Sequence, residues 1–361
     1  MANILVFGAT GFTGRQIVQE LDRRGASYIL AGRSEKRLVE LSESLSRRPE
    51  IRVAHADKPT TVDAALEGIG LVINTVGPFT DLGETVVRSA LSRGIHYIDT
   101  TGEQSFIYAM ETRFHALAQQ HNAVLCCALA FEYALGECAA AIACEALEGD
   151  IDLLETFYST GKGGVSRGTA KSIMRAMTAD MLAWESGRLI PEKMASTTSE
   201  ITFNGEDRYR QAVSFGGGMP LHARHLGNVR EARSFLVMNE DMIRGLKRYQ
   251  PATRLLRIGP LQRVVDRVVD WKIPSSGPDT KETSFRVAAR ARKAGLETQV
   301  CVIGKDPYGI TACLAAEGAT RFMAGEQRQS GAYSVASLLN PRHILDALSD
   351  AGVSWSLVDG K

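Results

Sequence analysis

The start of the chain constrains its fold more than any other segment. Residues 4–7 form a short apolar run suited to a buried parallel strand, and a glycine-rich stretch follows at residues 8–14. Apolar side chains then recur at helical spacing at Ile17, Val18 and Leu21. A strand, a glycine turn and a helix in this order are typical of a dinucleotide-binding domain, because a helix N-terminus offers free N–H groups to a pyrophosphate.

The glycines of this turn are spaced GxxGxxG, which differs from the more common GxGxxG pattern. We expect Gly8 to permit a tight turn, Gly11 to let the backbone approach a pyrophosphate, and Gly14 to let the helix pack on the strand. The residues between the glycines complete the loop. The predicted phosphate-binding residues are therefore Gly8, Thr10, Gly11, Phe12, Thr13 and Gly14.

Strands and helices continue to alternate after this loop. Further strands are predicted at residues 28–31, 51–53, 71–73, 96–98 and 123–126, with helices between them at 35–45, 61–66, 84–91 and 106–119. Strands joined through helices pair in parallel. The sequence therefore predicts an N-terminal Rossmann domain, a doubly wound parallel α/β sheet, with a dinucleotide along its carboxyl edge.

The end of the second predicted strand favours NADP over NAD. An NAD site usually carries an acidic residue there to bind the ribose 2′-hydroxyl, whereas this chain has Arg33 and Ser34. A guanidinium and a hydroxyl match a 2′-phosphate, and Arg37, one helical turn later, is placed to close the same clamp. The alternative is that Arg33 is only a solvated charge at the end of a strand.

Two later loops are predicted to contact the same cofactor. Asp57 follows the third strand and is expected either to contact the adenine or to cap the next helix. Residues 74–79 follow the fourth strand and should run beside the nicotinamide ribose, with Gly77 allowing close approach and Pro78 stiffening the turn. From this segment the predicted cofactor residues are Asn74, Val76, Gly77 and Pro78.

The second half of the chain has a different periodicity. Strands are predicted at residues 152–159, 200–204, 211–215, 233–237, 285–291 and 298–303, and helices at 170–186, 240–249 and 261–269. A largely antiparallel sheet in an α+β domain follows from this pattern. The predicted domains are 1–130 for the cofactor, 131–305 for substrate and dimerisation, and 306–361, with helices at 312–324 and 341–351 and a strand at 353–357, returning to the first domain.

The charge balance and the length of the apolar runs limit which partners the chain is expected to bind. The chain has 42 Lys and Arg residues against 41 Asp and Glu residues, a formal net charge of +1, so no bulk field favours nucleic acid or an anionic membrane. Its longest wholly apolar run, residues 123–131, is far shorter than the roughly 18 to 20 residues of a spanning helix. The first residues lack a positively charged leader. We therefore expect a cytoplasmic protein that binds neither nucleic acid nor membrane.

Cysteine and histidine patterns do not indicate a metal site. The six cysteines form no CxxC pair and are mostly embedded in apolar sequence, which favours reduced core residues. His222 and His225 have a spacing that two ligands on one helix use, but they follow three glycines that predict a loop, and no carboxylate or thiol accompanies them in the sequence. No metal is expected.

Four motifs together resemble one protein family. They are GATGFTGR at residues 8–15, AGR at 31–33, NTVGPF at 74–79 and YIDTTGE at 97–103. They are similar to motifs of the saccharopine dehydrogenase-like oxidoreductases, in particular the trans-acting enoyl reductases. Residues 163–172 and 306–312 extend the resemblance over most of the chain. Residues 128–136 depart from it, because they lack the Asp and Ser of the family's CGFDS-like segment.

This resemblance implies an NADPH-dependent reductase of an enoyl thioester that is linked to coenzyme A or to a carrier. Tyr133 and Lys171 are then candidate proton donors, and Glu103 either orders the nicotinamide carboxamide or begins a helix. The turn at residues 164–169 either stabilises the developing negative charge with free amides or ends in an ordinary N-cap at Thr169.

Several alternatives stay open. Reduction of an imine or carbonyl, as in saccharopine chemistry, needs a cationic cluster, which Arg167, Arg224 and Arg230 are able to supply. A sensor that binds NADP without turnover is a second alternative, although the roughly 200 residues beyond the Rossmann unit argue against it. A homodimer through the open face of the second sheet is expected. The candidate docking face for an acidic carrier protein is Arg244, Lys247, Arg248, Arg254 and Arg257.

Overall fold

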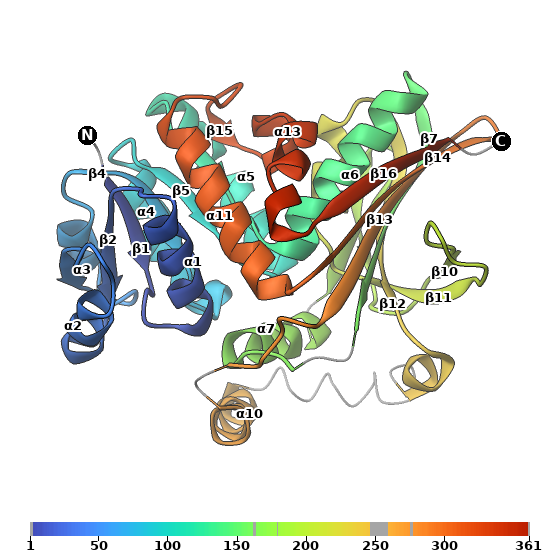
Figure 1. The fold of residues 1–361 in the computed structure, drawn as a ribbon. Helices are drawn as coiled ribbons and strands as arrows, with labels where there is room; N and C mark the ends of the chain where they lie inside the picture. The colour runs from blue at the N-terminus through green and yellow to red at the C-terminus, as the bar shows by residue number, and fades with distance from the viewer. Residues whose placement is uncertain (1–2, 162–163, 179, 246–258, 275–276, 360–361) are drawn as a thin grey trace. The chain divides into compact units, whose positions relative to one another are not determined.

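The computed structural model describes residues 3–161, 164–178, 180–245, 259–274 and 277–359 (Figure 1). The chain divides into two compact units, each assembled from separate stretches of sequence. Unit 1 consists of Met1–Thr101, Phe106–Phe131 and Tyr308–Asn340, and unit 2 of Gly102–Ser105, Glu132–Pro307 and Pro341–Lys361.

Unit 1 contains a seven-stranded, wholly parallel sheet in the order β15-β6-β5-β4-β1-β2-β3. Its strands are β1 (Asn3–Phe7), β2 (Tyr28–Gly32), β3 (Ile51–Val53), β4 (Ile69–Asn74), β5 (His96–Asp99), β6 (Val124–Cys126) and β15 (Gly331–Ala332). The connecting helices are α1 (Phe12–Arg23), α2 (Glu35–Glu43), α3 (Pro59–Ala65), α4 (Phe79–Leu91) and α5 (Gln104–Gln120). The predicted Rossmann fold is confirmed.

The central strands of unit 1 are apolar because both of their faces are covered. Residues of β1, β2 and β4 form the centre of the core, with Val6, Leu30 and Val72 wholly buried. α1 packs on the core through Ile17, Val18 and Leu21, which are also wholly buried. The apolar spacing that predicted this helix thus marks the face that it buries.

Unit 2 is built on a nine-stranded mixed sheet. The strands along its main path follow the order β10-β11-β12-β7-β13-β14-β16, and β7 pairs in parallel with β12 and antiparallel with β13. They are β10 (Thr198–Ile201), β11 (Arg210–Phe215), β12 (Val229–Val237), β7 (Ile151–Thr160), β13 (Ser284–Lys293), β14 (Leu296–Lys305) and β16 (Ser354–Asp359). The remaining pairings in this sheet are antiparallel, so the predicted largely antiparallel sheet is confirmed.

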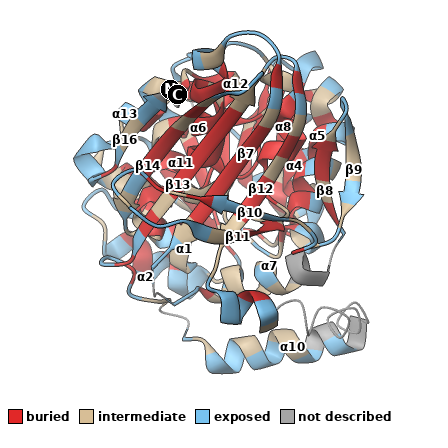
Figure 2. Cartoon of the chain, turned by 90° about the vertical axis from the view of Figure 1, so that its right-hand side faces the viewer, coloured by how far each residue is buried: buried red, intermediate tan, exposed pale blue. Residues whose placement is uncertain are grey.

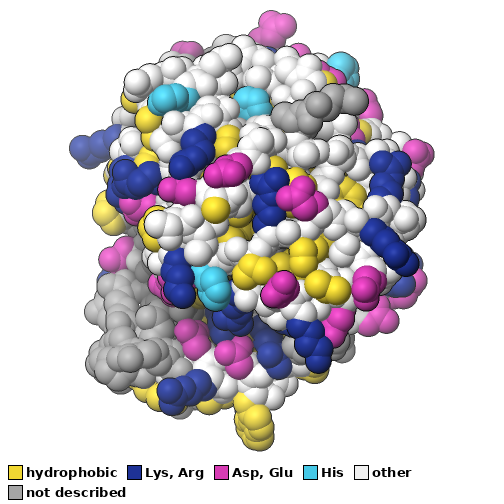
Figure 3. All heavy atoms as spheres, turned by 90° about the vertical axis from the view of Figure 1, so that its left-hand side faces the viewer, with side chains coloured by type: hydrophobic (Ala, Val, Ile, Leu, Met, Phe, Trp, Pro, Cys, Tyr) yellow, Lys and Arg dark blue, Asp and Glu magenta, His cyan; other side chains and the backbone are white. Residues whose placement is uncertain are grey.

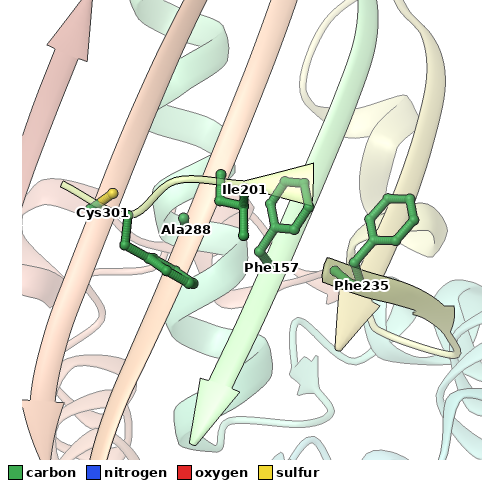
Figure 4. Packing of buried hydrophobic residues seen from close by; sticks show 7 residues of the cluster. Phe157, Ile201, Phe235, Ala288 and Cys301 are labelled. Atoms are coloured by element: carbon green, nitrogen blue, oxygen red, sulfur yellow. The ribbon is translucent and has the colours of Figure 1, made fainter. Parts of the chain in front are cut away.

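The hairpin of β10 and β11 folds across one face of this sheet, and Figure 2 shows both strands crossing in front of it. Ile201, the last residue of β10, and Phe203, two residues later, are buried in one cluster with Phe157 of β7 and Ala288 of β13. Figure 4 labels Ile201, Phe157 and Ala288 in this cluster. The prediction of an uncovered sheet face is therefore wrong for this part of the sheet, because the chain buries the apolar side chains there against its own hairpin.

Three elements of unit 2 differ from the prediction. The helix predicted over 170–186 ends earlier, as α7 (Arg167–Thr178), and β8 (Met181–Glu185) forms a hairpin with β9 (Arg188–Glu192). Ser186 and Gly187 both have positive φ, 51° and 80°, as a two-residue hairpin turn requires. The helix predicted at 240–249 is present over its described residues, 240–245, and residues 246–249 lie outside the described part.

The longest helix that the sequence did not predict is α6 (Phe131–Leu147). Most of its own residues are small or apolar, and they are buried around nearly the whole circumference of the helix. Its sequence therefore lacks the one-sided apolar pattern that identifies a surface helix. The C-terminal segment also differs from the prediction. Residues 308–340 join unit 1 through α11 (Pro307–Met323) and β15, but β16 pairs with β14 in unit 2. Assigning all of 306–361 to the first domain is therefore wrong.

No helix among the described residues has both the length and the hydropathy needed to cross a membrane. On the face drawn in Figure 3, Lys and Arg side chains are interspersed with Asp and Glu side chains. This distribution matches the balanced composition of the chain, so this face carries no extended field of one sign.

Candidate cofactor and catalytic site

The loop between β1 and α1 requires glycine at two positions. Gly8 has a φ of +90°, and a Cβ there would lie 2.6 Å from Thr75 Oγ1. A Cβ on Gly14 would lie 2.3 Å from the Gly8 carbonyl oxygen. Since real Cβ atoms do not approach other atoms this closely, any side chain at Gly14 would displace the loop from the helix.

This loop leaves the N-terminus of α1 open to an anion. Gly11 is the N-cap residue, and no side chain caps the helix. Phe12 and Thr13, in the first turn, are partly exposed. Their N–H groups belong to the set that lacks partners within a helix, so the geometry fits a pyrophosphate.

The end of β2 lies directly beside this loop. The N–H groups of Gly8 and Ala9 donate to the Ala31 carbonyl oxygen, at 2.9 and 3.1 Å. Arg33, two residues after Ala31, is exposed and has no ion-pair or hydrogen-bond partner in the described part of the chain. A guanidinium in this state is available to a 2′-phosphate.

Ser34 and Arg37 have different surroundings. Ser34 is the N-cap residue of α2, but its side chain makes no capping hydrogen bond. Arg37 Nη2 donates to the Thr10 carbonyl oxygen at 2.8 Å, so Arg37 braces the glycine loop. The structure thus brings Thr10 and Arg37 together, while their predicted contacts with a cofactor stay predictions.

Asp57 is exposed in the turn between β3 and α3. The N-cap residue of α3 is Lys58, and no side chain caps this helix. The alternative in which Asp57 caps the helix is therefore wrong. Contact between its carboxylate and the adenine stays a prediction.

The turn after β4 is organised by a buried polar network. Asn74 is wholly buried; its Nδ2 donates to Tyr97 Oη at 3.0 Å, and its Oδ1 accepts from the Val76 N–H at 3.0 Å. Both ends of the amide are thus engaged inside the protein, which indicates that Asn74 shapes the turn. The turn continues with exposed Gly77 and with Pro78, the N-cap residue of α4, and the Gly77–Pro78 peptide bond is cis.

Asp99 completes this network and was not among the predicted site residues. Its Oδ1 accepts from the Ala128 and Thr101 N–H groups at 2.8 and 3.0 Å, and its Oδ2 accepts from Tyr97 Oη at 3.0 Å. Complete burial raises the pKa of the Asp99 carboxyl to about 6, although these hydrogen bonds act to lower it. An aspartate at the end of a buried strand was the signal that sequence reasoning overlooked.

Two of the predicted catalytic residues meet at one short segment of unit 2. Tyr133, in the first turn of α6, is buried with Oη 3.1 Å from the Gly102 carbonyl oxygen and 2.7 Å from that of Gly216, where it donates. Burial, the largest cause, raises the pKa of the Tyr133 hydroxyl well above its usual value. Glu103, also buried, accepts from Ser172 Oγ at 2.8 Å.

Lys171 lies next to Ser172 in sequence but is engaged elsewhere. Its Nζ forms an ion pair with Asp270 of α10 (Gly259–Lys272) at 2.8 Å. The N-cap expected at Thr169 is instead made by Ser166, whose Oγ accepts from the Thr169 N–H at 3.2 Å. The catalytic roles of Tyr133, Lys171 and Glu103 stay predictions.

Glu132 is a second residue that the sequence did not single out. It precedes Tyr133 at the start of α6 and is partly exposed. Although the residue as a whole is partly exposed, its carboxyl group is buried, and this burial raises the pKa of Glu132 to about 7. A carboxyl with this pKa is protonated in a large fraction of molecules at neutral pH, which suits a general acid.

The histidine pair has a carboxylate companion that sequence spacing did not reveal. His222 ends the short helix α8 (Met219–His222), where a loop was predicted, and its Nδ1 lies 2.7 Å from Glu137 Oε1 of α6. No group of three or more His, Cys, Asp or Glu residues among those described is arranged to hold a metal ion.

Comparison with known proteins assigns the N-terminal domain. Residues 4–126 match the family model described as the saccharopine dehydrogenase NADP-binding domain. A putative trans-acting enoyl reductase of Mycobacterium tuberculosis is 31% identical over 189 residues, 49% of this chain and 44% of that protein. The lipid droplet localized protein of Caenorhabditis elegans is 27% identical over 210 residues, 53% of this chain and 49% of that protein.

A saccharopine dehydrogenase-like oxidoreductase of Mus musculus is 27% identical over 178 residues, 45% of this chain and 42% of that protein. The matches thus span about half the length of these relatives. The solved structure of saccharopine dehydrogenase (L-Glu forming) from Saccharomyces cerevisiae covers all of both chains, with a TM-score of 0.68 and 10% identity, and it shows the fold. Residues 4–126 therefore match an NADP-binding domain of the saccharopine dehydrogenase type, and about half of the chain is similar to saccharopine dehydrogenase-like oxidoreductases.

Proposed function

We propose that the protein is an NADPH-dependent reductase of an activated C=C bond, acting on an enoyl thioester linked to coenzyme A or to a carrier. The choice of NADPH over NADH rests on the exposed Arg33 guanidinium beside the uncapped glycine loop. The choice of an enoyl substrate rests on the mycobacterial relative, which is named as a putative enoyl reductase. The Caenorhabditis elegans relative, named for lipid droplets, supports an acyl substrate from lipid metabolism.

NADPH, when bound, supplies the hydride that is added to the β-carbon of the substrate. The protein must then stabilise negative charge on the thioester oxygen and deliver a proton to the α-carbon, which leaves a saturated thioester and NADP⁺. The N-terminus of α7 suits the first task, because a helix N-terminus favours negative charge.

We propose that Glu132 donates the proton that reaches the α-carbon, and that Tyr133 is a positioning residue. The Glu132 carboxyl, with a pKa of about 7, holds a proton that it is able to release near neutral pH. The Tyr133 hydroxyl donates to the backbone carbonyls of Gly102 and Gly216, so it holds together two segments that are distant in sequence. Lys171, paired with Asp270, is the remaining candidate donor.

A substrate screen tests this function. Oxidation of NADPH would be followed with enoyl, imine and keto substrates, and each product would be identified by mass. Reduction of enoyl thioesters, with a mass gain of about two hydrogens and no reaction of the imines, is the expected result. Tight NADPH binding without oxidation by any substrate would instead support a sensor.

Reduction of an imine or carbonyl is the second candidate, because the whole chain shares the fold of saccharopine dehydrogenase. This reaction needs cations that bind substrate carboxylates. Arg167 Nε donates to the Ile273 carbonyl oxygen at 2.5 Å, and Arg224 Nε donates to His225 at 3.0 Å. The Arg167 and Arg224 guanidinium groups thus already have internal partners. Of the three cations, Arg230 alone is exposed and without a side-chain partner among the described residues, which makes this candidate the weaker one.

We also propose that the protein is a cytoplasmic homodimer. Ile303 and Val358 remain exposed on the sheet face that the β10–β11 hairpin covers only in part. Light scattering after size exclusion should give twice the mass of one 39.2 kDa chain. A single-chain mass at all concentrations would exclude the dimer.

A further inference from the structure

We propose that α10 is an interfacial helix that binds an anionic phospholipid surface. Four apolar side chains of this helix are exposed, with exposed fractions of 38%, 52%, 44% and 81%. They are Leu261, Val264, Val268 and Trp271, and we call them the α10 stripe. Exposure of a large aromatic side chain to this extent is unfavourable in water, so a surface that removes the stripe from water would bind the helix.

The spacing of the stripe places its members on one side of the helix. At 3.6 residues per turn, the four positions fall within an arc of about 80°. In Figure 2 the drawn part of α10 is tan or pale blue, and none of its described residues is buried. Lys171 of α7 pairs with Asp270 of α10, which holds the helix to unit 2 without covering the stripe.

The charges around the stripe favour an anionic surface. Arg267 and Lys272 of α10 are exposed. Of the two acidic residues of this helix, Asp270 is paired with Lys171, and Asp266 is partly buried and has a partner of its own. The sequence before α10 contains five basic residues and no acidic one at positions 244–257, although all of these basic residues except Arg244 lie outside the described part of the chain. Basic residues beside an exposed apolar stripe with Trp are typical of helices that lie in a membrane interface.

The size of the stripe argues for lipid rather than for a protein partner. Its four side chains expose roughly 400 Å², about half of what each partner buries in a stable protein interface. Binding to a lipid surface has no such threshold, because it grows with the apolar area inserted and with the attraction to anionic headgroups. This inference replaces the expectation, drawn from net charge, that the protein does not bind membranes.

Co-sedimentation of the full chain with vesicles tests the proposal. Vesicles of phosphatidylcholine alone would be compared with vesicles that also contain about 30% phosphatidylserine. We expect at least about tenfold tighter binding to the anionic vesicles, reduced by salt, with a blue shift of tryptophan emission. Trp271→Ser combined with Val268→Ser should weaken this binding by about tenfold or more.

Matched variants separate a specific contact from a folding defect. Trp355→Phe removes a tryptophan of β16 outside the stripe and should leave vesicle binding unchanged. Since the stripe is exposed, the double variant should keep the thermal midpoint and the NADPH binding of the parent chain. Arg267→Glu should weaken binding to anionic vesicles and leave binding to neutral vesicles unchanged.

Four outcomes would overturn the proposal, three of them in the measurements described above. Those three are equal binding to both kinds of vesicle, full vesicle binding by the double variant, and self-association that the double variant abolishes. Preferential capture of an acidic carrier protein through the same stripe would also overturn it. None of these outcomes depends on enoyl reduction, so this test and the test of the proposed function fail independently.

Discussion

The two units present their candidate functional groups in opposite ways. In unit 1 the glycine loop is uncapped and Arg33 is exposed without a partner among the described residues. In unit 2, Tyr133 and Glu103 are buried and already hydrogen-bonded. Groups of the first kind are ready to bind a ligand, whereas groups of the second kind hold the protein in shape. Substitutions in unit 1 should therefore affect cofactor binding, and those in unit 2 should affect turnover.

Gly14→Ala should have the largest effect on NADPH affinity. It should therefore test most clearly whether unit 1 is the unit that binds the cofactor. The new Cβ would lie 2.3 Å from the Gly8 carbonyl oxygen, so the loop must move and its amides no longer converge on the pyrophosphate. We expect NADPH affinity to fall by about 100-fold or more, measured by calorimetry. Gly245→Ala, at a site with nothing within 4 Å of the added atom, is the control and should bind NADPH normally.

Asp99→Ala should be the most destabilising change in unit 1. It leaves the buried N–H groups of Thr101 and Ala128 without an acceptor, at a cost of about 3 kcal/mol, measurable by urea unfolding. Asp99→Asn keeps an oxygen for both N–H groups and should cost much less. An equal loss in the two variants would contradict the proposed role of the acceptor.

The titration of Asp99 should make the free energy of unfolding depend on pH. The pKa of this carboxyl in the folded protein, about 6, lies above its ordinary value, so the folded state binds the proton more tightly. The resulting stabilisation is present below pH about 4 and is lost as the pH rises through about 6. Unfolding curves of Asp99→Asn should lack this loss.

Arg33→Asp tests the choice of cofactor within unit 1. Loss of a charge-assisted clamp on the 2′-phosphate should weaken NADPH by about 10- to 100-fold and change NADH affinity much less. Arg328→Asp makes the same charge change at another exposed position of unit 1 and is the control. Equal weakening of both cofactors in Arg33→Asp would exclude a 2′-phosphate site.

Glu132→Gln tests the proton source in unit 2. If Glu132 donates the proton, turnover falls as the pH rises through about 7, because the deprotonated carboxylate has no proton to give. The variant should lose about tenfold or more of kcat and should also lose this limb of the pH profile. NADPH affinity should stay unchanged. A parental pH profile in the variant would exclude Glu132 as the acid.

Tyr133→Phe should have the smallest effect. It removes a hydrogen bond to two backbone carbonyls, so stability should fall by about 1 kcal/mol and turnover only a few-fold. The fall in turnover as the pH rises through about 7 should remain in this variant. If this fall in turnover disappeared, Tyr133 would be the proton donor. It would then not be a structural group of unit 2, as the comparison of the two units assumes.

Predictability from sequence differed between the units for a physical reason. In unit 1 each strand is followed by the helix that packs on it, so local periodicity and the glycine spacing located β1, α1 and Arg33 directly. In unit 2, β7 pairs with strands that begin at residues 229 and 284. Local patterns do not encode such pairings, which is why β8, β9 and the all-round apolar α6 were not predicted.

The sequence by itself determined the Rossmann unit, its glycine-rich loop and the basic residue at the end of β2, because these depend on contacts between neighbouring segments. Only the tertiary structure decided what surrounds each polar group. Folding buried Asp99 beside Tyr97, brought Glu137 to His222 across 85 positions, and left the α10 stripe exposed. Burial depends on which distant segments pack together, and a pattern within one segment carries no record of that.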